Sequence, residues 1–324
     1  MSEKRTLDAR KTAELLLSFK RPTVIMHTRP DGDTVGSAAA LIAVFEQLGI
    51  AAQYACADKI PKRLAFLAEN LTCSEALDER ELIAIDVASA SQLGALSEYA
   101  DRITLTIDHH RVNSPFSDNF TLPDASSAGE TLFAVISELI AMKKITLTES
   151  IAYPLYAAIS SDTGGFLFSS ATPKTYRTAA ALMECGIDYA DVNHRLFHSK
   201  STEQLRAEGF IASKIKTAAE GKIAYASLSK DERKALGALP EHFETAIDVI
   251  RSLLFAEVAV FVRENDDGTF KASIRSTELN VAEIAYEFGG GGHVRAAGCS
   301  VEAESAEQGA ELVVLRIEKE FKNK

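Results

Sequence analysis

Apolar segments that alternate with helical ones are the feature that most constrains the fold of this chain. Residues 23–26 form a short apolar run with β-branched members, and similar runs follow at 82–85 and 103–107. Helical patterns flank these runs, at residues 7–20, 37–48, 129–143, 149–160 and 173–185. Strands that alternate with helices predict an α/β domain built on a parallel sheet.

The pattern changes after about residue 195. Further strands are predicted at 223–228, 257–262 and 271–276, and helices at 241–254, 281–288 and 304–321. We therefore predict a larger parallel-sheet N-terminal domain and a smaller mixed α/β C-terminal domain, with the active site in the cleft between them. The predicted boundaries are 1–193 for the first domain, 194–207 for a linker and 208–324 for the second domain.

The charge of the chain argues against a partner with many phosphates. The formal net charge is -11, whereas affinity for long nucleic acids depends on many lysine and arginine contacts. A small phosphate ligand is compatible with this charge, because bound divalent cations can reverse the local field. The polar N-terminus and the lack of a bilayer-length apolar run predict a cytoplasmic protein. The cysteines lack a CxxC pair and predict neither a zinc ribbon nor a disulfide framework; they are Cys56, Cys73, Cys185 and Cys299.

Potential metal ligands directly follow the first predicted strand. His27, Asp31 and Asp33 lie within one short loop, and Gly32 lets that loop turn tightly, so the two carboxylates could face different ions. In an open parallel sheet, the carboxyl ends of the strands form the ligand-binding edge. Taken alone, this group is equally compatible with a solvated Asp-Gly turn beside a chance histidine.

The next two predicted strands also end in polar side chains. Asp86 follows the second strand, and Asp108, His109 and His110 follow the third. An aspartate there can be only a helix cap, but two adjacent imidazoles point in different directions, so that one can bind a metal while the other faces a substrate. Asp162 follows a long helical pattern and precedes a glycine turn, where a polar helix end is the alternative.

Together these groups predict a metal centre. They would gather several carboxylates and imidazoles at one edge of the sheet, where the carboxylates would repel one another strongly without cations. Mixed carboxylate and imidazole ligands suit Mn²⁺, and they suit Mg²⁺ or Zn²⁺ less well. A cluster of this size is best filled by two ions about 3.5–4 Å apart, the spacing used for in-line attack on phosphorus.

The same residues, in the same order, resemble the motifs of the DHH phosphoesterase superfamily. The match runs through His27-x3-Asp31-x-Asp33, Asp86, Asp108-His109-His110 and Asp162. Farther along, Gly289-Gly290-Gly291-Gly292-His293 matches the glycine-rich signature of the DHH-associated domain. The resemblance covers nearly the whole chain, and within the superfamily the chain is similar to small bacterial nanoRNases, also called oligoribonuclease and phosphoadenosine phosphate phosphatases.

The resemblance implies a role for each residue at the predicted metal centre. One ion would be bound by His27, Asp31 and Asp86, and the other by Asp33, Asp86, His109 and Asp162. The predicted catalytic residues are Asp86, Asp108 and His110. Asp86 would bridge the two ions, and His110 would contact the scissile phosphate or protonate the leaving group. Asp108 would orient a histidine from behind the ligands.

A glycine-rich loop in the second half predicts a nucleotide site. Asn280 and Glu283 are expected to form a helix N-cap with its capping box, and Gly289 is expected to end that helix. Consecutive glycines expose N–H groups to which phosphate oxygens can bind. The resemblance implies that this domain binds the terminal nucleotide, and the candidate residues are Arg275, Ser276, Gly290, Gly291, Gly292 and His293.

The leading hypothesis is a hydrolase that uses two divalent ions to activate water. Its expected substrates are short oligoribonucleotides, cleaved to mononucleotides, and 3′-phosphoadenosine 5′-phosphate, converted to AMP. The alternative is a cyclic-dinucleotide phosphodiesterase, and a pyrophosphatase, an exopolyphosphatase or a silent nucleotide sensor rank lower. The expected partners are small nucleotides, with no long nucleic acid and no membrane; the sequence leaves open whether the chain forms a homodimer.

Overall fold

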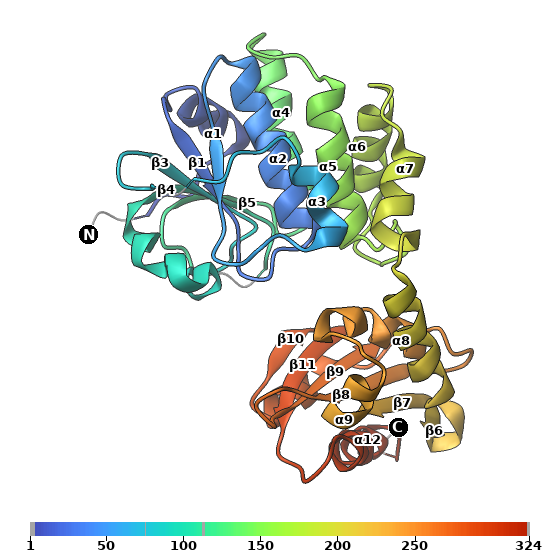
Figure 1. The fold of residues 1–324 in the computed structure, drawn as a ribbon. Coiled ribbons are helices and arrows are strands. Elements are labelled where there is room, and N and C mark those ends of the chain that lie inside the picture. The colour runs from blue at the N-terminus through green and yellow to red at the C-terminus, as the bar shows by residue number, and fades with distance from the viewer. Residues whose placement is uncertain (1–3, 75, 112–113, 323–324) are drawn as a thin grey trace. The chain divides into compact units, whose positions relative to one another are not determined.

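A computed structural model describes residues 4–74, 76–111 and 114–322 of the chain. Two compact units follow one another, Met1–Ser199 and Lys200–Lys324 (Figure 1). The first contains an all-parallel sheet and the second a mixed sheet, so the predicted α/β class is confirmed. Within the part of the chain that the structure describes, none of the helices has the length and apolar character needed to cross a bilayer.

The sheet of the first unit has the strand order β2-β1-β3-β4-β5. Its strands are β1 (Pro22–Ile25), β2 (Gln53–Ala55), β3 (Glu81–Ile85), β4 (Ile103–Asp108) and β5 (Asp118–Thr121). The sequence predicts β1, β3 and β4, which pair with one another in parallel at the middle of the sheet. Because these neighbours run in the same direction, their carboxyl ends meet at one edge.

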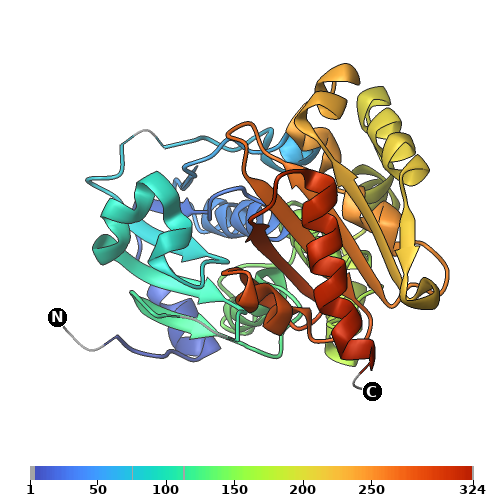
Figure 2. The same ribbon diagram turned by 90° about the horizontal axis from the view of Figure 1, so that it is seen from below.

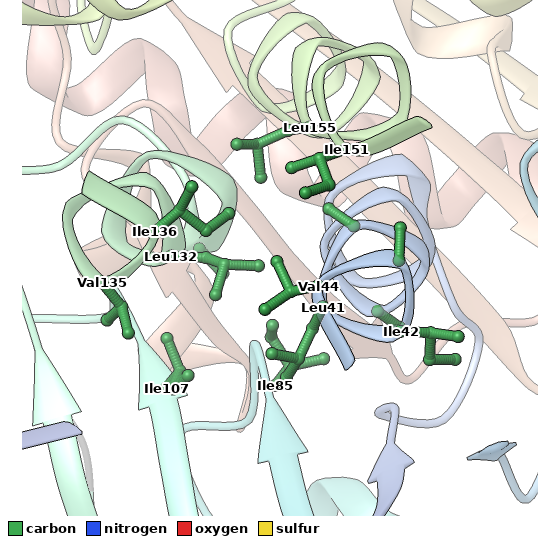
Figure 3. Packing of buried hydrophobic residues seen from close by; sticks show 14 of the residues in the cluster. Leu41, Ile42, Val44, Ile85, Ile107, Leu132, Val135, Ile136, Ile151 and Leu155 are labelled. Atoms are coloured by element: carbon green, nitrogen blue, oxygen red, sulfur yellow. The ribbon is translucent and has the colours of Figure 1, made fainter. Parts of the chain in front are cut away.

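Helices cover the face of the sheet that Figure 3 shows. The α-helices of this unit are α1 (Ala9–Leu16), α2 (Gly32–Gln47), α3 (Ala65–Ala68), α4 (Ala128–Ala141), α5 (Glu149–Asp162), α6 (Pro173–Met183) and α7 (Tyr189–Asn193). Leu41 of α2 and Leu132 of α4 belong to the same buried cluster as Ile85 and Ile107 of the strands (Figure 3). A second cluster joins other strand side chains to Leu93 of the 3-10 segment η2 (Ala90–Arg102).

Small residues let α2, α4 and α5 approach one another closely. A Cβ atom on Gly36 would lie 2.5 Å from the carbonyl oxygen of Pro154 and 3.1 Å from the Cβ of Ala158. A Cβ atom on Gly129 would lie 2.7 Å from the same Ala158 methyl group. The side chain of Ala158 in α5 therefore fits against backbone in both neighbouring helices, and α2 is buried along most of its length.

The second unit is built on a sheet with the order β10-β11-β9-β8-β7-β6. Its strands are β6 (Lys216–Ala218), β7 (Ile223–Leu228), β8 (Val258–Glu264), β9 (Phe270–Ser276), β10 (Gly291–His293) and β11 (Ala296–Val301). Its α-helices are α8 (Thr202–Ser213), α9 (Lys230–Ala235), α10 (Ala246–Arg251), α11 (Val281–Glu287) and α12 (Ala306–Lys322). Helix α12 lies across the strands in Figure 2 and shares their hydrophobic core with α11, whereas α8 and α10 pack in a separate cluster on the sheet.

The structure differs from three of the helix predictions made from the sequence. Helix α2 begins at Gly32 rather than at residue 37, because the Asp31 carboxylate accepts hydrogen bonds from the amides of Asp33 and Thr34. The helix predicted at 241–254 is instead a 3-10 turn, Pro240–Phe243, followed by α10. The predicted capping box at the start of α11 is wrong, since the Asn280 side chain donates to the Glu283 carboxylate and accepts no backbone hydrogen bond.

The close crossing of α2 and α5 predicts that Gly36→Ala is destabilising. The added methyl group would meet the backbone of α5, and overpacking of this kind costs about 1–3 kcal/mol. A matched control is Gly209→Ala in α8, where nothing lies within 4 Å of the new Cβ atom and helix propensity favours alanine by about 0.8–1 kcal/mol. Calorimetric unfolding of the full chain should show a lower transition temperature for the first variant only; an unchanged transition would contradict the close approach.

Candidate active site

The predicted metal ligands converge at the carboxyl edge of β1, β3 and β4. Three sets of side chains each offer ligand atoms that lie within 4.8 Å of one another. The sets are His27 with Asp31 and Asp86, Asp33 with His109 and Asp162, and Asp86 with His109 and His110. Residues up to 135 positions apart in the chain thus meet in one place.

Asp86 lies between His27 and His109. Its Oδ2 atom is 3.3 Å from Nε2 of His27, and its Oδ1 atom is 3.6 Å from Nε2 of His109. The residue is 3% exposed and has a φ of 59°, a left-handed value that aspartate adopts more readily than most residues other than glycine. Its amide donates to the carbonyl of Ile107 on the neighbouring strand. This hydrogen bond holds the backbone of Asp86 in the left-handed conformation and so fixes the position of the carboxylate.

Asp33 is fixed by the start of another helix. Its carboxylate accepts hydrogen bonds from the amides of Ala128 (2.7 Å) and Gly129 (3.0 Å), in the first turn of α4, and from the hydroxyl of Ser37 (3.1 Å). The side chain is 1% exposed. Anions are favoured at a helix N-terminus because free N–H groups point toward them. The start of α4 therefore holds Asp33 in place, and it does so from residues that the sequence analysis did not identify.

His27 is oriented by backbone. Its Nδ1 atom lies 2.7 Å from the carbonyl oxygen of Thr28, which can only accept, so Nδ1 carries a hydrogen and Nε2 faces the carboxylates. The amide of Thr28 in turn donates to the carbonyl of Gln92, whose side-chain oxygen accepts the amides of Ala88 and Ser89. One residue of η2 thus joins the loop after β1 to the loop after β3. The spacing Ser89-x-x-Gln92 is that of a capping box at the start of η2, so the sequence could have indicated Gln92 as a capping residue but not its contact with Thr28.

Asp108 and His110 form a pair beside the cluster. Nδ1 of His110 lies 2.7 Å from Oδ1 of Asp108, which is the last residue of β4 and is fully buried. Burial alone would lower the pKa of His110, but the hydrogen bond and charge of Asp108 raise it to about 9. Burial would raise the pKa of Asp108, but the hydrogen bond from His110 lowers it. The pair is therefore an imidazolium and a carboxylate at neutral pH.

The electrostatics of the cluster fit a cation. Burial and the charge of Asp86 raise the pKa of both Asp33 and Asp162 well above its usual value. Burial would lower the pKa of His27, but the carboxylates of Asp31 (3.7 Å) and Asp86 (3.3 Å) beside its Nε2 atom raise it to about 11. Among the described residues, Oδ1 of Asp86 is buried without a hydrogen-bond donor. Such an oxygen is costly unless a positive charge compensates it, and oxygen and imidazole donors are ligands of divalent metals.

The candidate residues of the second unit meet at the β9, β10 and β11 end of its sheet. Arg275 pairs in register with Ala296, which pairs with His293. Two of the candidate residues already make hydrogen bonds within the protein. The hydroxyl of Ser276 accepts hydrogen bonds from the amides of residues 278 and 279. The amide of Gly290 donates to a carbonyl of α11. Gly291, Gly292 and His293 form the edge strand β10 itself.

The fold and the site together define a metal-dependent phosphoesterase. Residues 22–159 match the DHH family N-terminal domain, and residues 220–319 match the DHHA1 domain. The chain belongs to the DHH family, whose phosphoesterases depend on metal ions.

Two named relatives and one solved structure are similar to this chain. The chain is 30% identical to a bifunctional oligoribonuclease and PAP phosphatase NrnA of Thermus thermophilus over 96% of its own length and 94% of that protein. It is 25% identical to a protein of the same name from Bacillus subtilis, over 86% of this chain and 89% of the relative. An exopolyphosphatase-related protein from Bacteroides fragilis has the same fold, with a TM-score of 0.87, 22% identity and coverage of 97% and 96% of the two chains.

The raised pKa values of the metal-free site predict that its stability falls as pH rises. His27 and His110 titrate near 6.5 when unfolded and at about 11 and about 9 when folded, so their ion pairs stabilise the fold fully below pH 6.5 and are lost as pH rises through the folded values. The raised pKa of Asp33 acts with the same sign, because the folded state holds that proton longer. Metal binding needs deprotonated ligands and strengthens with pH.

Thermal unfolding at pH 6.5, 7.5 and 8.5, in EDTA and in Mn²⁺, measures both effects. We expect the Tm in EDTA to fall across this range and the rise in Tm caused by Mn²⁺ to grow. An equal Mn²⁺ effect at every pH would mean that the histidines do not exchange protons for metal.

Proposed function

We propose that this phosphoesterase cleaves short oligoribonucleotides to mononucleotides and removes the 3′-phosphate of 3′-phosphoadenosine 5′-phosphate, and that it does so with two Mn²⁺ ions. The observation that carries the proposal is the position of Asp86, whose two carboxylate oxygens face different histidines. The names of the relatives from Thermus thermophilus and Bacillus subtilis support both substrates.

The ligand sets give each ion its own donors. We assign His27, Asp31 and Asp86 to one ion, and Asp33, Asp86, His109 and Asp162 to the other. The ligand atoms of the first three residues lie within 4.8 Å of one another, and so do those of Asp33, His109 and Asp162. The 3.6 Å distance from Asp86 to His109 supports placing Asp86 in the second group as well. When bound, paired divalent cations withdraw charge from phosphate oxygens and make water more acidic. The positions of the ions would be set by ligand side chains that are themselves held in place. The amides at the start of α4 hold the carboxylate of Asp33, and η2 holds the loop that carries His27.

His110 supplies the proton for the leaving oxygen in this proposal. Its Nδ1 atom is held by Asp108, and we assign the transferred proton to Nε2, the other ring nitrogen. The hydrogen bond to Asp108 raises the pKa of His110 and favours the protonated ring, so Nε2 can donate a hydrogen bond to the phosphate and then its proton. Asp108 is a positioning residue, because it is buried and reaches the substrate only through His110.

The second unit binds the terminal nucleotide in the same proposal. Arg275 and His293 lie at one end of its sheet and offer donors to phosphate. Gly290, Gly291 and Gly292 allow backbone to approach a ligand closely, and Ser276 shapes the loop beside Arg275 through its hydrogen bonds. The domain limits 1–193, 194–207 and 208–324, the cleft between the domains and the cytoplasmic location stay predictions.

Removal of the shared carboxylate tests the metal centre. Asp86→Asn keeps the size of the side chain and tolerates a positive φ, so its effect reports the lost charge. Turnover of a dinucleotide in Mn²⁺ should fall by more than the roughly 10- to 100-fold loss typical of residues behind metal ligands. EDTA should stop the wild type, and Asp124→Asn, whose carboxylate is 91% exposed, should match the wild type. Activity of Asp86→Asn close to wild type would remove Asp86 from the centre.

Arg275→Ala tests the nucleotide site of the second unit. A charge-assisted hydrogen bond contributes about 1.5–3 kcal/mol, so KM should rise roughly 10- to 150-fold, while kcat changes little. Arg206→Ala removes the same charge from an exposed position of α8 and serves as the control. An unchanged KM for Arg275→Ala would place the nucleotide elsewhere.

A further inference from the structure

The turn after Asp162 has an unusual backbone. Gly164, Gly165 and Phe166 follow one another with φ of 57°, 67° and 67°. Two glycines adopt such angles readily, but phenylalanine in this region is a conformational outlier. The Thr163 hydroxyl holds the turn, because it accepts the amide of Phe166 (3.1 Å) and donates to the carbonyl of Ile159 (2.7 Å). Strained backbone that the surroundings hold in place is characteristic of functional sites.

The turn places two apolar side chains in solvent beside a predicted metal ligand. The amide of Phe168 donates to the carbonyl of Thr163 (3.0 Å), and its ring packs against Gly164. Phe168 is 38% exposed, and Leu167, at 85%, is the most exposed large apolar side chain among the described residues. Phe168 is therefore anchored directly to the residue that follows Asp162, and Leu167 lies between Phe166 and Phe168, which both bond to Thr163.

We infer that Leu167 and Phe168 form a subsite for the base of the nucleoside on the other side of the scissile phosphate from the terminal nucleotide. This inference rests on the proposed function and names a second part of its substrate. The carboxylate of Asp162 lies 3.6 Å from Nε2 of His109, within the cluster that would hold the phosphate. Because Thr163 directly follows Asp162 and binds the amide of Phe168, the turn is the segment that we assign to the base of the nucleoside esterified to that phosphate.

The chemistry of the segment suits a base rather than a phosphate. Residues 163–172 contain no charged side chain, so they offer no ionic partner to an anion. An aromatic ring and a leucine side chain instead favour stacking and apolar contact, which accept any base. The rings of Phe166, in the same turn, and Tyr176 pack together with their centroids 5.4 Å apart. The hydroxyl of Tyr176 also donates to the carbonyl of Phe166.

The two proposed substrates differ in this part of the molecule. A dinucleotide has a nucleoside on each side of the scissile phosphate. 3′-Phosphoadenosine 5′-phosphate has one nucleoside, and the other oxygens of its 3′-phosphate are free. The subsite therefore contributes to binding of the dinucleotide and not to binding of 3′-phosphoadenosine 5′-phosphate.

The test compares KM for both substrates in Leu167→Ser, Phe168→Ala and Phe168→Tyr. For 5′-pApA, Phe168→Ala should raise KM roughly 5- to 100-fold, Leu167→Ser should raise it less, and Phe168→Tyr should restore it because the ring is kept. For 3′-phosphoadenosine 5′-phosphate, each variant should keep the wild-type KM. Leu315→Ser, at an exposed position of α12, is the control for loss of an exposed leucine.

A parallel rise in KM for the two substrates would overturn the subsite, since it would mean that the turn only supports Asp162. Unchanged KM values for 5′-pApA in both Leu167→Ser and Phe168→Ala would overturn it as well. The wild-type rates test the proposed function, whereas the ratio of the two KM changes in the variants tests the subsite, so each can fail separately.

Discussion

The shared carboxylate of Asp86 is the constraint around which the active site is organised. It is buried, it adopts a left-handed backbone, and its oxygens face His27 on one side and His109 on the other. Its Oδ1 atom is buried without a hydrogen-bond donor, which is unfavourable unless a positive charge compensates it. In the metal-free protein, His27 supplies positive charge beside Asp86. The site is therefore suited to bind metal in exchange for protons that the metal-free protein holds.

Helix α2 connects this constraint to the rest of the first unit. Its N-cap is Asp31, its first turn contains Asp33, and one turn later Gly36 meets α5. Gly32 has the same function one turn earlier, since a Cβ atom there would lie 2.3 Å from the hydroxyl of Ser161. The residue after Ser161 is Asp162, so the close contact of α2 with α5 sets the distance between ligands from opposite ends of the motif series.

The sequence predicted that these side chains would converge because parallel strands impose a common edge. Once β1, β3 and β4 are recognised, the positions of His27, Asp86 and His109 follow from topology alone. The positions of the groups that hold these ligands in place did not follow from the topology. Gln92 acts on Thr28 through its backbone carbonyl, and Ala128 acts on Asp33 through its backbone N–H; such contacts depend on tertiary placement and leave no residue pattern. Ser37, four residues after Asp33 on one helix face, is the exception that spacing could have revealed.

The glycine run of the second unit shows how one motif can meet two requirements. A Cβ atom on Gly290 would lie 2.2 Å from the carbonyl oxygen of Gly298, and one on Gly292 would lie 2.5 Å from that of Ala296. These glycines are therefore needed first for the packing of β10 against β11, whatever the ligand. Because β10 is at the edge of the sheet, one side of its backbone has no strand partner among the described residues and can still accept a ligand. A phosphate at this edge would thus be bound by a strand that the glycines allow to form, rather than by a flexible loop.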